Sequence, residues 1–154
     1  MVTIKTPEEI QIMCEGGKIL AKIIRELAKS TKARVKTEEL DRLAEKLAQK
    51  YNAQPSFKGY EGYPKSLCIS INEELVHCLP SKREIKEGDI VSLDFGIWYK
   101  GLCTDSAVTI GVGKISPEAK KVINVTKKAL YIGIKQVRSQ AHLGDIGSAI
   151  QKYV

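Results

Sequence analysis

The chain has 154 residues, of which 43% are hydrophobic and 28% are charged, a balance typical of a folded globular protein and not of a disordered or collagen-like chain. No stretch approaches the about 18 consecutive apolar residues of a membrane span, and charged residues stand where a secretory signal would be apolar, so we expect a cytoplasmic protein without membrane association. The net charge of +7 lies mainly in the two terminal thirds and favours loose attraction to an anionic partner such as RNA, while the lack of a long Lys/Arg run argues against sequence-specific nucleic-acid recognition.

Two helices are predicted in the first 50 residues. Thr6-Pro7-Glu8-Glu9 is typical of a helix start, with Thr6 as the cap and Glu9 completing a capping box, and apolar residues recur at three- and four-residue steps to about residue 29. Gly16-Gly17 within this helix indicates close backbone packing. Thr37 is expected to cap a second helix, in which Leu40, Leu43, Ala44 and Leu47 repeat the helical period.

The middle of the chain predicts a loop and then an antiparallel sheet. Glycines, prolines and aromatics alternate over residues 55–64, which predicts a loop, and a strand is expected over residues 67–71. A turn at Asn72-Glu73 leads into an expected short strand at residues 75–77. The main hairpin is predicted to join residues 90–99 to residues 102–112 through Lys100-Gly101.

Two more helices are predicted after this hairpin, from Pro117 to about Arg138 and from about Gly144 onward. No linker is long enough to separate two domains. We therefore expect an α+β fold, an antiparallel sheet with helices packed on one face, in one domain over residues 1–154.

The main hairpin brings two aspartates together. If Lys100-Gly101 forms a two-residue turn, Asp105 lies opposite Gly96 and Asp94 is its diagonal neighbour on the same face, with about 7 Å or less between the β-carbons. No lysine or arginine occurs within either strand, so a shared divalent metal fits the pair better than a salt bridge. Two structural alternatives remain open: Asp105 caps a turn, and Asp94 lies at a solvated sheet edge.

Other candidate residues are ambiguous when taken alone. His77 could be structural or merely exposed, and Tyr60, Tyr63 and Cys68 could be core residues. The four cysteines contain no C-x-x-C pair, which indicates free thiols and argues against a structural zinc site.

Taken together, several motifs resemble those of type I methionine aminopeptidases in order and in spacing. They are Thr6-Pro7-Glu8-Glu9-Ile10, the run from Gly59-Tyr60-Glu61-Gly62-Tyr63-Pro64 through Cys68-Ile69-Ser70-Ile71-Asn72, His77, Gly88-Asp89-Ile90-Val91-Ser92-Leu93-Asp94, and Thr104-Asp105-Ser106. The resemblance extends across the whole chain. It implies the first half of a pita-bread fold, in which two pseudo-symmetric halves enclose two divalent metal ions (Co, Mn, Fe or Zn) and remove the initiator methionine from nascent polypeptides.

The resemblance also implies a role for each candidate residue. Asp94 would chelate one metal and Asp105 would bridge both, while His77 would act in catalysis by hydrogen bonding to the substrate near the scissile amide. Tyr60, Tyr63 and Cys68 would form the wall of the pocket for the methionine side chain. Phe57 is assigned to the same wall, although some relatives have a cysteine there. Cys78 replaces a glycine that many relatives have after this histidine.

The chain departs from the family in length. The family takes three further metal ligands, one histidine and two glutamates, from its second half, whereas only His142, Glu118 and Asp145 follow Asp105 here. We therefore expect an incomplete version with little activity alone, whose exposed half-core favours self-association and whose basic ends favour ribosome association. The alternative is a non-catalytic pita-bread protein that associates with the ribosome or RNA.

Overall fold

The computed structural model describes residues 3–154, which divide into two compact units. Unit 1 extends to Lys114, and unit 2 runs from Ile115 to Val154. The single domain expected over residues 1–154 stays a prediction. No helix in the described residues is long and apolar enough to cross a membrane.

Unit 1 begins with two helices, α1 (Pro7–Ser30) and α2 (Thr37–Lys50). The predicted capping box is confirmed: the Glu9 amide donates to the Thr6 hydroxyl (3.2 Å), and the Thr6 amide donates to the Glu9 carboxylate (2.8 Å). The predicted cap of α2 is wrong. Thr37 is the first residue inside the helix, and its hydroxyl instead exchanges hydrogen bonds with the backbone of Ser81.

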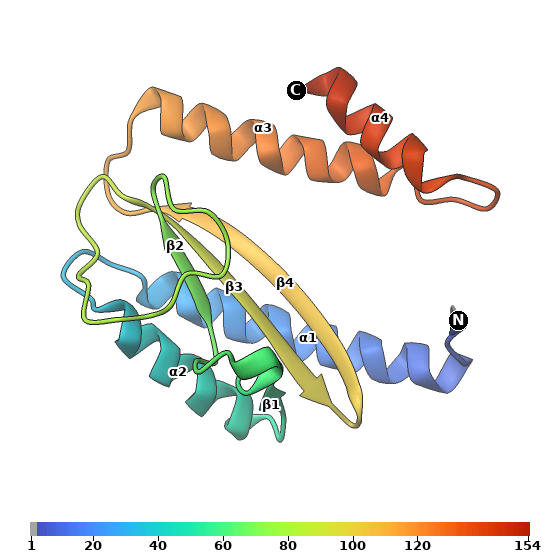
Figure 1. The fold of residues 1–154 in the computed structure, drawn as a ribbon, viewed down its shortest axis with the longest axis horizontal. Helices are drawn as coiled ribbons and strands as arrows, with labels where there is room; N and C mark the ends of the chain where they lie inside the picture. The colour runs from blue at the N-terminus through green and yellow to red at the C-terminus, as the bar shows by residue number, and fades with distance from the viewer. Residues whose placement is uncertain (1–2) are drawn as a thin grey trace. The chain divides into compact units, whose positions relative to one another are not determined.

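The sheet is built around one central strand (Figure 1). β3 (Ile90–Tyr99) pairs along its whole length with β4 (Leu102–Gly111). The short strands β1 (Gln54–Pro55) and β2 (Cys68–Ile71) pair with the opposite edge of β3, and every pairing is antiparallel. Lys100 and Gly101 both have positive φ (48° and 80°), as a two-residue hairpin turn requires. The predicted hairpin register is therefore confirmed.

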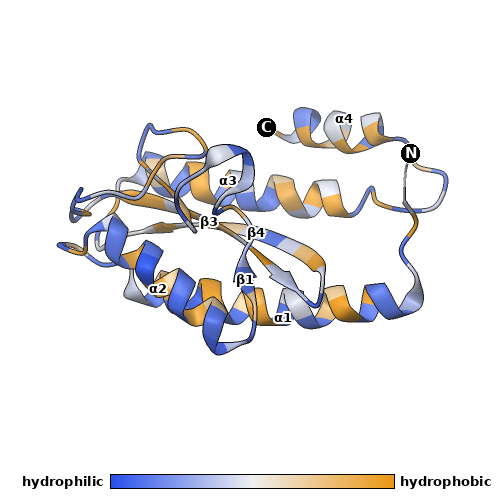
Figure 2. Cartoon of the chain, turned by 60° about the horizontal axis from the view of Figure 1, so that its bottom comes forward, coloured by the Kyte–Doolittle hydropathy of each residue, from blue (hydrophilic) through white to orange (hydrophobic). Residues whose placement is uncertain are grey.

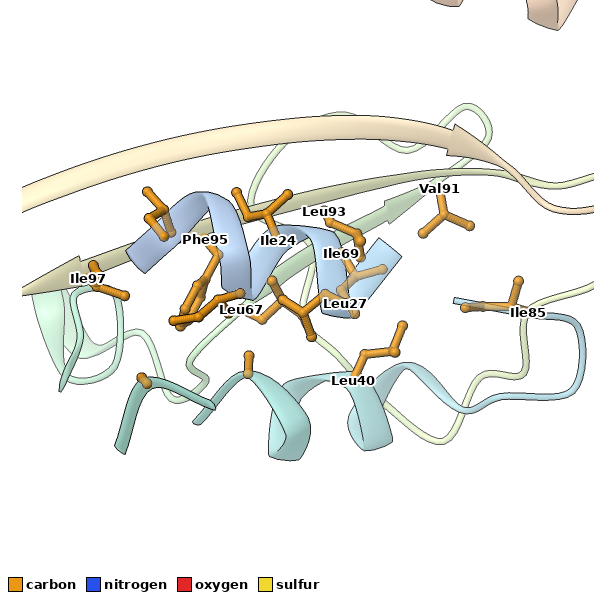
Figure 3. Close-up of a cluster of buried hydrophobic side chains, with 14 of the residues drawn as sticks. Ile24, Leu27, Leu40, Leu67, Ile69, Ile85, Val91, Leu93, Phe95 and Ile97 are labelled. Atoms are coloured by element: carbon orange, nitrogen blue, oxygen red, sulfur yellow. The ribbon is translucent and has the colours of Figure 1, made fainter. Parts of the chain in front are cut away.

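The core lies between the sheet and the two helices. Alternate residues of β3 (Val91, Leu93, Phe95 and Ile97) are fully buried on the face that α1 and α2 cover (Figure 3). The two helices carry mixed polar and apolar bands, as an amphipathic helix does (Figure 2). Gly16 lies close to Thr104 and Tyr99, which confirms the close packing expected there, whereas nothing approaches Gly17.

The connection between β2 and β3 differs from the prediction. Asn72 and Glu73 form the expected turn, but the strand predicted at residues 75–77 is wrong, because residue 75 is irregular and residues 76–77 form a bend. Leu75 and Val76 are 83% and 72% exposed. These β-prone side chains therefore have no half-buried surface to pack against, and such packing is what favours a strand.

Unit 2 consists of two helices, α3 (Pro117–Ile134) and α4 (Leu143–Tyr153). The Ser116 hydroxyl caps α3, which ends four residues before the expected Arg138. The two helices pack closely, because a β-carbon on Gly133 would lie only 3.0 Å from the Ile150 side chain.

Candidate metal and substrate site

The face of the sheet opposite the helices carries the two aspartates. Asp94 pairs with Cys68 on β2 and with Ala107 on β4, while Asp105 pairs with Gly96. Paired residues, and residues two apart on one strand, share a face of a sheet. Asp94 and Asp105 therefore lie on the same face, at the diagonal positions expected from the sequence.

Neither structural alternative for the aspartates agrees with this geometry. Asp94 is half-buried on the central strand and not at an edge, and Asp105 lies inside β4 and not at a turn. None of the six ion pairs found within residues 3–154 involves either carboxylate. The two acids thus share a face without forming an ion pair.

The electrostatics of the pair favour the binding of a cation. The pKa of the Asp94 carboxyl is raised from 3.8 to about 6, mainly by burial and next by the negative charge of Asp105, while nearby His77 partly offsets these effects. Divalent ions such as Mn²⁺ prefer carboxylate oxygens, and their charge would relieve this repulsion. The donors therefore suit a divalent ion, although no group of three or more His, Cys, Asp or Glu side chains suited to a metal occurs in the described part of the chain.

Gly96 lets other groups approach the acids closely. A β-carbon at this position would lie 2.2 Å from the Ser56 Oγ, 3.1 Å from the Phe57 ring and 3.4 Å from the Asp105 carboxylate. The Ser56 amide donates to the Gly96 carbonyl (2.9 Å), which continues the pairing of β1 with β3 past Pro55. Any side chain at Gly96 would displace this corner of the site.

All seven site residues named from the sequence lie around one pocket of about 560 Å³. Its lining residues are Phe57, Tyr60, Glu61, Gly62, Tyr63, Pro64, Cys68, His77, Leu79, Asp94 and Asp105. Four of them were not predicted. Glu61, Gly62 and Pro64 belong to the same Gly-Tyr-x-Gly-Tyr-Pro segment as the predicted tyrosines, so the motif itself could have indicated them.

The loop that carries the tyrosines turns through left-handed backbone. Gly59 and Gly62 have φ of 89° and 82° on either side of the short 3₁₀ helix η1 (Tyr60–Gly62). The Tyr63 hydroxyl points back toward β2, 3.2 Å from the carbonyl oxygen of Leu67 and 3.3 Å from that of Cys78. Burial raises the pKa of Tyr63 and also that of the Cys68 thiol, so both stay protonated at neutral pH and form a neutral wall.

His77 reaches the pocket from an irregular segment. Its φ of 62° is left-handed, and the Ile69 amide donates to the carbonyl of the next residue, Cys78 (3.1 Å), which ties this segment to β2. The side chain is exposed at the mouth of the pocket. A backbone hydrogen bond, and not the expected strand, therefore holds the histidine near the acids.

Asp41 holds the chain segment that leads into β2, and the sequence analysis did not identify it. It is a buried carboxylate of α2 whose Oδ1 accepts from the amides of Ser66 (2.8 Å) and Leu67 (3.0 Å). Lys65 lies 3.8 Å from its other oxygen. These bonds fix the chain just before Cys68 enters β2. The only signal in the sequence was an acid on the helix face next to Leu40 and Ala44.

The profile of Metallopeptidase family M24 matches residues 11–154. Methionine aminopeptidase 1 from Bacillus subtilis is 46% identical over 154 residues, and a methionine aminopeptidase from Clostridium acetobutylicum is 47% identical over 155 residues. Each alignment covers 100% of this chain and 62% of the relative. The chain thus spans less than two thirds of the length of these relatives.

Solved structures share the fold. The crystal structure of methionine aminopeptidase from Thermotoga maritima superimposes with a TM-score of 0.97 at 41% identity, covering 100% of this chain and 62% of that one. A prolidase from Pyrococcus furiosus gives a TM-score of 0.88 at 22% identity, covering 97% and 43%, a likeness of fold alone. These neighbours bear out the α+β, pita-bread class expected from the sequence.

Proposed function

The chain belongs to metallopeptidase family M24, and from this membership we propose that it forms the methionine-binding part of an aminopeptidase that removes the N-terminal methionine from polypeptides. One observation carries the proposal. Two carboxylates, a histidine and an aromatic wall surround a single pocket on the polar face of the sheet. The family requires divalent metal ions, and oxygen donors suited to them lie at the base of this pocket.

In the proposed site Asp94 and Asp105 hold the ions, two in a complete site, drawn from Co, Mn, Fe or Zn. Such ions, when bound, acidify water and polarise a carbonyl group. The chain itself contributes by keeping the two carboxylates on one face, where burial and then the negative charge of Asp105 raise the pKa of Asp94 to about 6. That unfavourable charge supports the proposal, because cation binding would relieve it.

The substrate is proposed to bind against the aromatic side chains and the thiol that line the same pocket. Tyr60, Tyr63, Cys68 and Phe57 offer aromatic rings and a protonated thiol, which suit the flexible, polarisable side chain of methionine. His77 is proposed to hydrogen bond to the substrate near the scissile amide, since it lies at the mouth of the pocket beside Asp94. These assignments predict loss of turnover on replacing His77 and weaker substrate binding on replacing Tyr60.

The activity of the 154 residues by themselves is proposed to be low. Three acids line the pocket, but only Asp94 and Asp105 share a face of the sheet, and no group of three that could hold a metal occurs in the described residues. Two carboxylates alone bind a divalent ion weakly. The resemblance assigns the other ligands to sequence that the relatives have beyond the matched region. We propose that activity requires these ligands.

A fusion tests the proposal directly. The chain is joined to the remaining C-terminal part of the Bacillus subtilis relative, and methionine release from a Met-Ala-Ser peptide is measured with Mn(II), Co(II) or Fe(II). We expect little release by the chain alone, release by the fusion, and a loss of at least a hundredfold in the fusion with Asp94→Asn or Asp105→Asn. The matched control is Glu73→Gln, an exposed acid without an ion pair, which should retain activity.

Two results would count against this function. A fusion that folds cooperatively and releases methionine equally well with both aspartates replaced would remove the metal role of the pair. Vigorous release by the chain alone would remove the claim that further ligands are needed.

The proposed substrate also fixes the setting. Nascent polypeptides carry their initiator methionine in the cytoplasm, so a cytoplasmic location near the ribosome forms part of the proposal.

Self-association is proposed through the apolar residues that α3 exposes, such as Val122 (58%) and Leu130 (58%). The alternative, a non-catalytic binding protein, ranks second because such a protein has no need for two unneutralised carboxylates in one pocket.

A further inference from the structure

Unit 2 carries a large excess of positive charge. Its 40 residues contain seven lysines and arginines but only two acids, Glu118 and Asp145. Five of the cations belong to α3 and its C-cap, and all five are exposed: Lys120, Lys121, Lys127, Lys128 and Lys135. The basic excess of the chain is thus concentrated on one helix.

These lysines lie on one side of α3. They recur at seven-residue steps, which correspond to nearly two helical turns, so with about 100° per residue all five fall within a sector of about 120°. The same sector contains Asn124 and Tyr131. We call these seven residues the lysine stripe. From Lys120 to Lys135 it extends about 22 Å along the helix axis.

The side of α3 opposite the lysines carries the buried residues of the helix. Ala129 and Gly133 are its two buried residues, and Gly133 lies against Ile146 and Ile150 of α4. Contact with α4 therefore uses these small residues and leaves the lysines of the stripe exposed, with Lys128 alone lying over the Tyr153 ring of α4. Exposed Tyr131 (55%) lies at the centre of the stripe, with Lys127, Lys128 and Lys135 within one turn of it.

The charges of the stripe are not neutralised within the described residues. The six ion pairs found there all lie in unit 1, and none uses a lysine of the stripe. A helix that only needs to be soluble can intersperse acids among its lysines at four-residue spacing, which adds stability. Here the uncharged members are Asn124 and Tyr131, so repulsion among the lysines remains until an anion binds.

We propose that the lysine stripe binds single-stranded RNA without sequence preference, with the lysines on successive phosphates and Tyr131 stacked on an unpaired base. Positive charge along a line matches a phosphate backbone, and an exposed aromatic ring among the lysines gives a base a surface for stacking. A paired helix would not offer that base, which favours a single strand. The inference goes beyond the proposed peptidase function, because it requires neither the pocket nor a metal.

An anionic membrane surface is the competing partner, and the composition of the stripe disfavours it. A helix that lies in a membrane interface inserts a continuous apolar face. Although α3 exposes Val122, Leu130 and Ile134, the exposed Thr126 interrupts this row, and no aliphatic residue belongs to the stripe itself. RNA is therefore the partner that these residues fit best.

The test measures binding of the whole 154-residue chain to a fluorescein-labelled oligouridylate of about 20 nucleotides, by anisotropy, between 50 and 200 mM KCl. The stripe variant combines Lys120→Gln, Lys121→Gln, Lys127→Gln and Lys128→Gln. The matched control removes the same charge from exposed, unpaired lysines of unit 1: Lys32→Gln, Lys46→Gln, Lys82→Gln and Lys86→Gln. Both variants have the same net charge, so only its location differs.

We expect the stripe variant to bind at least tenfold more weakly than the control at 100 mM KCl. The slope of log K against log salt should fall by about 2 to 3, because each lost phosphate contact on a single strand contributes about 0.7. Tyr131→Ala should weaken binding about tenfold and Tyr131→Phe should not, since stacking needs the ring and not the hydroxyl. The pair Lys120→Gln/Lys127→Gln repeats the test without disturbing Lys128, which lies over the Tyr153 ring.

Three outcomes would overturn the proposal. Equal losses in the stripe and control variants would show that only total charge matters. No binding by the parent chain at 50 mM KCl would show that the stripe is merely solvated. Stripe-dependent binding to phosphatidylserine/phosphatidylcholine vesicles that is tighter than binding to the oligouridylate would assign the surface to membranes instead. Circular dichroism of each variant verifies that α3 remains helical.

Discussion

Asp94 is the residue at which stability and proposed function conflict. Its carboxylate is half-buried on the central strand beside a second acid, and no cation within the described residues pairs with it. If stability alone determined this position, we would expect an apolar residue or an acid in an ion pair. The cost of the charge therefore supports a role in binding.

The raised pKa of Asp94 leads to a pH-dependent prediction. Because its folded pKa is about 6 and its unfolded value about 3.8, the contribution of this group to stability is fully present below about pH 3.8 and is lost as the pH rises through 6. Asp94→Asn removes the charge. In EDTA we expect the variant to be more stable than the parent by roughly 1 to 2 kcal/mol at pH 7, after allowance for partial solvent exposure, and nearly equal at pH 3.5.

Urea unfolding at both pH values checks this prediction, with Glu73→Gln as the control that should show no such difference. An Asp94→Asn variant that is less stable than the parent at pH 7 would contradict it.

Gly96 is the second residue whose identity the site constrains. Gly96→Ala would place a methyl group 2.2 Å from the Ser56 Oγ, so we expect a loss of about 1 to 3 kcal/mol in the free energy of unfolding. Ser56→Ala removes a buried hydroxyl that has no hydrogen-bond partner and should cost little. The double variant should lose less than the sum of the two changes, because the clashing oxygen is gone.

Gly17→Ala is the internal control for this series. Nothing lies within 4 Å of a β-carbon at Gly17, in the middle of α1, so alanine should stabilise the chain by up to about 1 kcal/mol. Thermal unfolding of all four variants measures these differences, and an additive double variant would argue against the contact at Gly96.

At the scale of elements, the site depends on how α2 meets β2. Asp41 accepts two backbone hydrogen bonds where the chain enters the strand, and Tyr63 reaches over the same segment. Cys68 thus pairs in register with Asp94 because a side chain of α2 holds the two residues that precede it. A helix and a loop position the pocket as much as the hairpin does.

Removing this anchor should be costly. Asp41→Ala leaves two buried amides, those of Ser66 and Leu67, without acceptors, and we expect a loss of about 2 to 4 kcal/mol in the free energy of unfolding. Asp41→Asn retains an acceptor oxygen and should lose less than half of that. Chemical denaturation measures both variants, and equal losses would show that the charge, and not the hydrogen bonds, is important.

At the scale of the whole molecule, the two units differ in how many hydrophobic residues they bury. The hydrophobic core cluster lies entirely in unit 1, from Leu20 to Val112, whereas α3 and α4 together contain two buried residues, Ala129 and Gly133. Most of the apolar burial that drives folding therefore belongs to the first unit.

A fragment that ends at Lys114 should consequently fold alone. We expect it to unfold cooperatively with a midpoint within a few degrees of that of the full chain, while residues 115–154 alone should show only partial helix by circular dichroism. A fragment of residues 1–114 without a cooperative transition would show that unit 1 depends on the second unit.

The sequence by itself determined the features that follow from local rules. The capping box at Thr6, the turn at Lys100-Gly101 and the alternation along residues 90–99 depend on neighbours within a few positions, so the hairpin register and the shared face of Asp94 and Asp105 could be predicted from them. Seven of the eleven residues that line the pocket were also named, mostly through the family resemblance, and their roles stay predictions.

Only the tertiary structure decided the features that depend on distant partners. Thr37 bonds to Ser81 instead of capping α2, and residues 75–77 form no strand and stay exposed. Asp41 becomes an anchor only because Ser66 and Leu67 arrive 25 residues later along the chain to donate to it. Local periodicity cannot indicate such contacts, since a buried polar group is satisfied by whichever segment the fold brings to it.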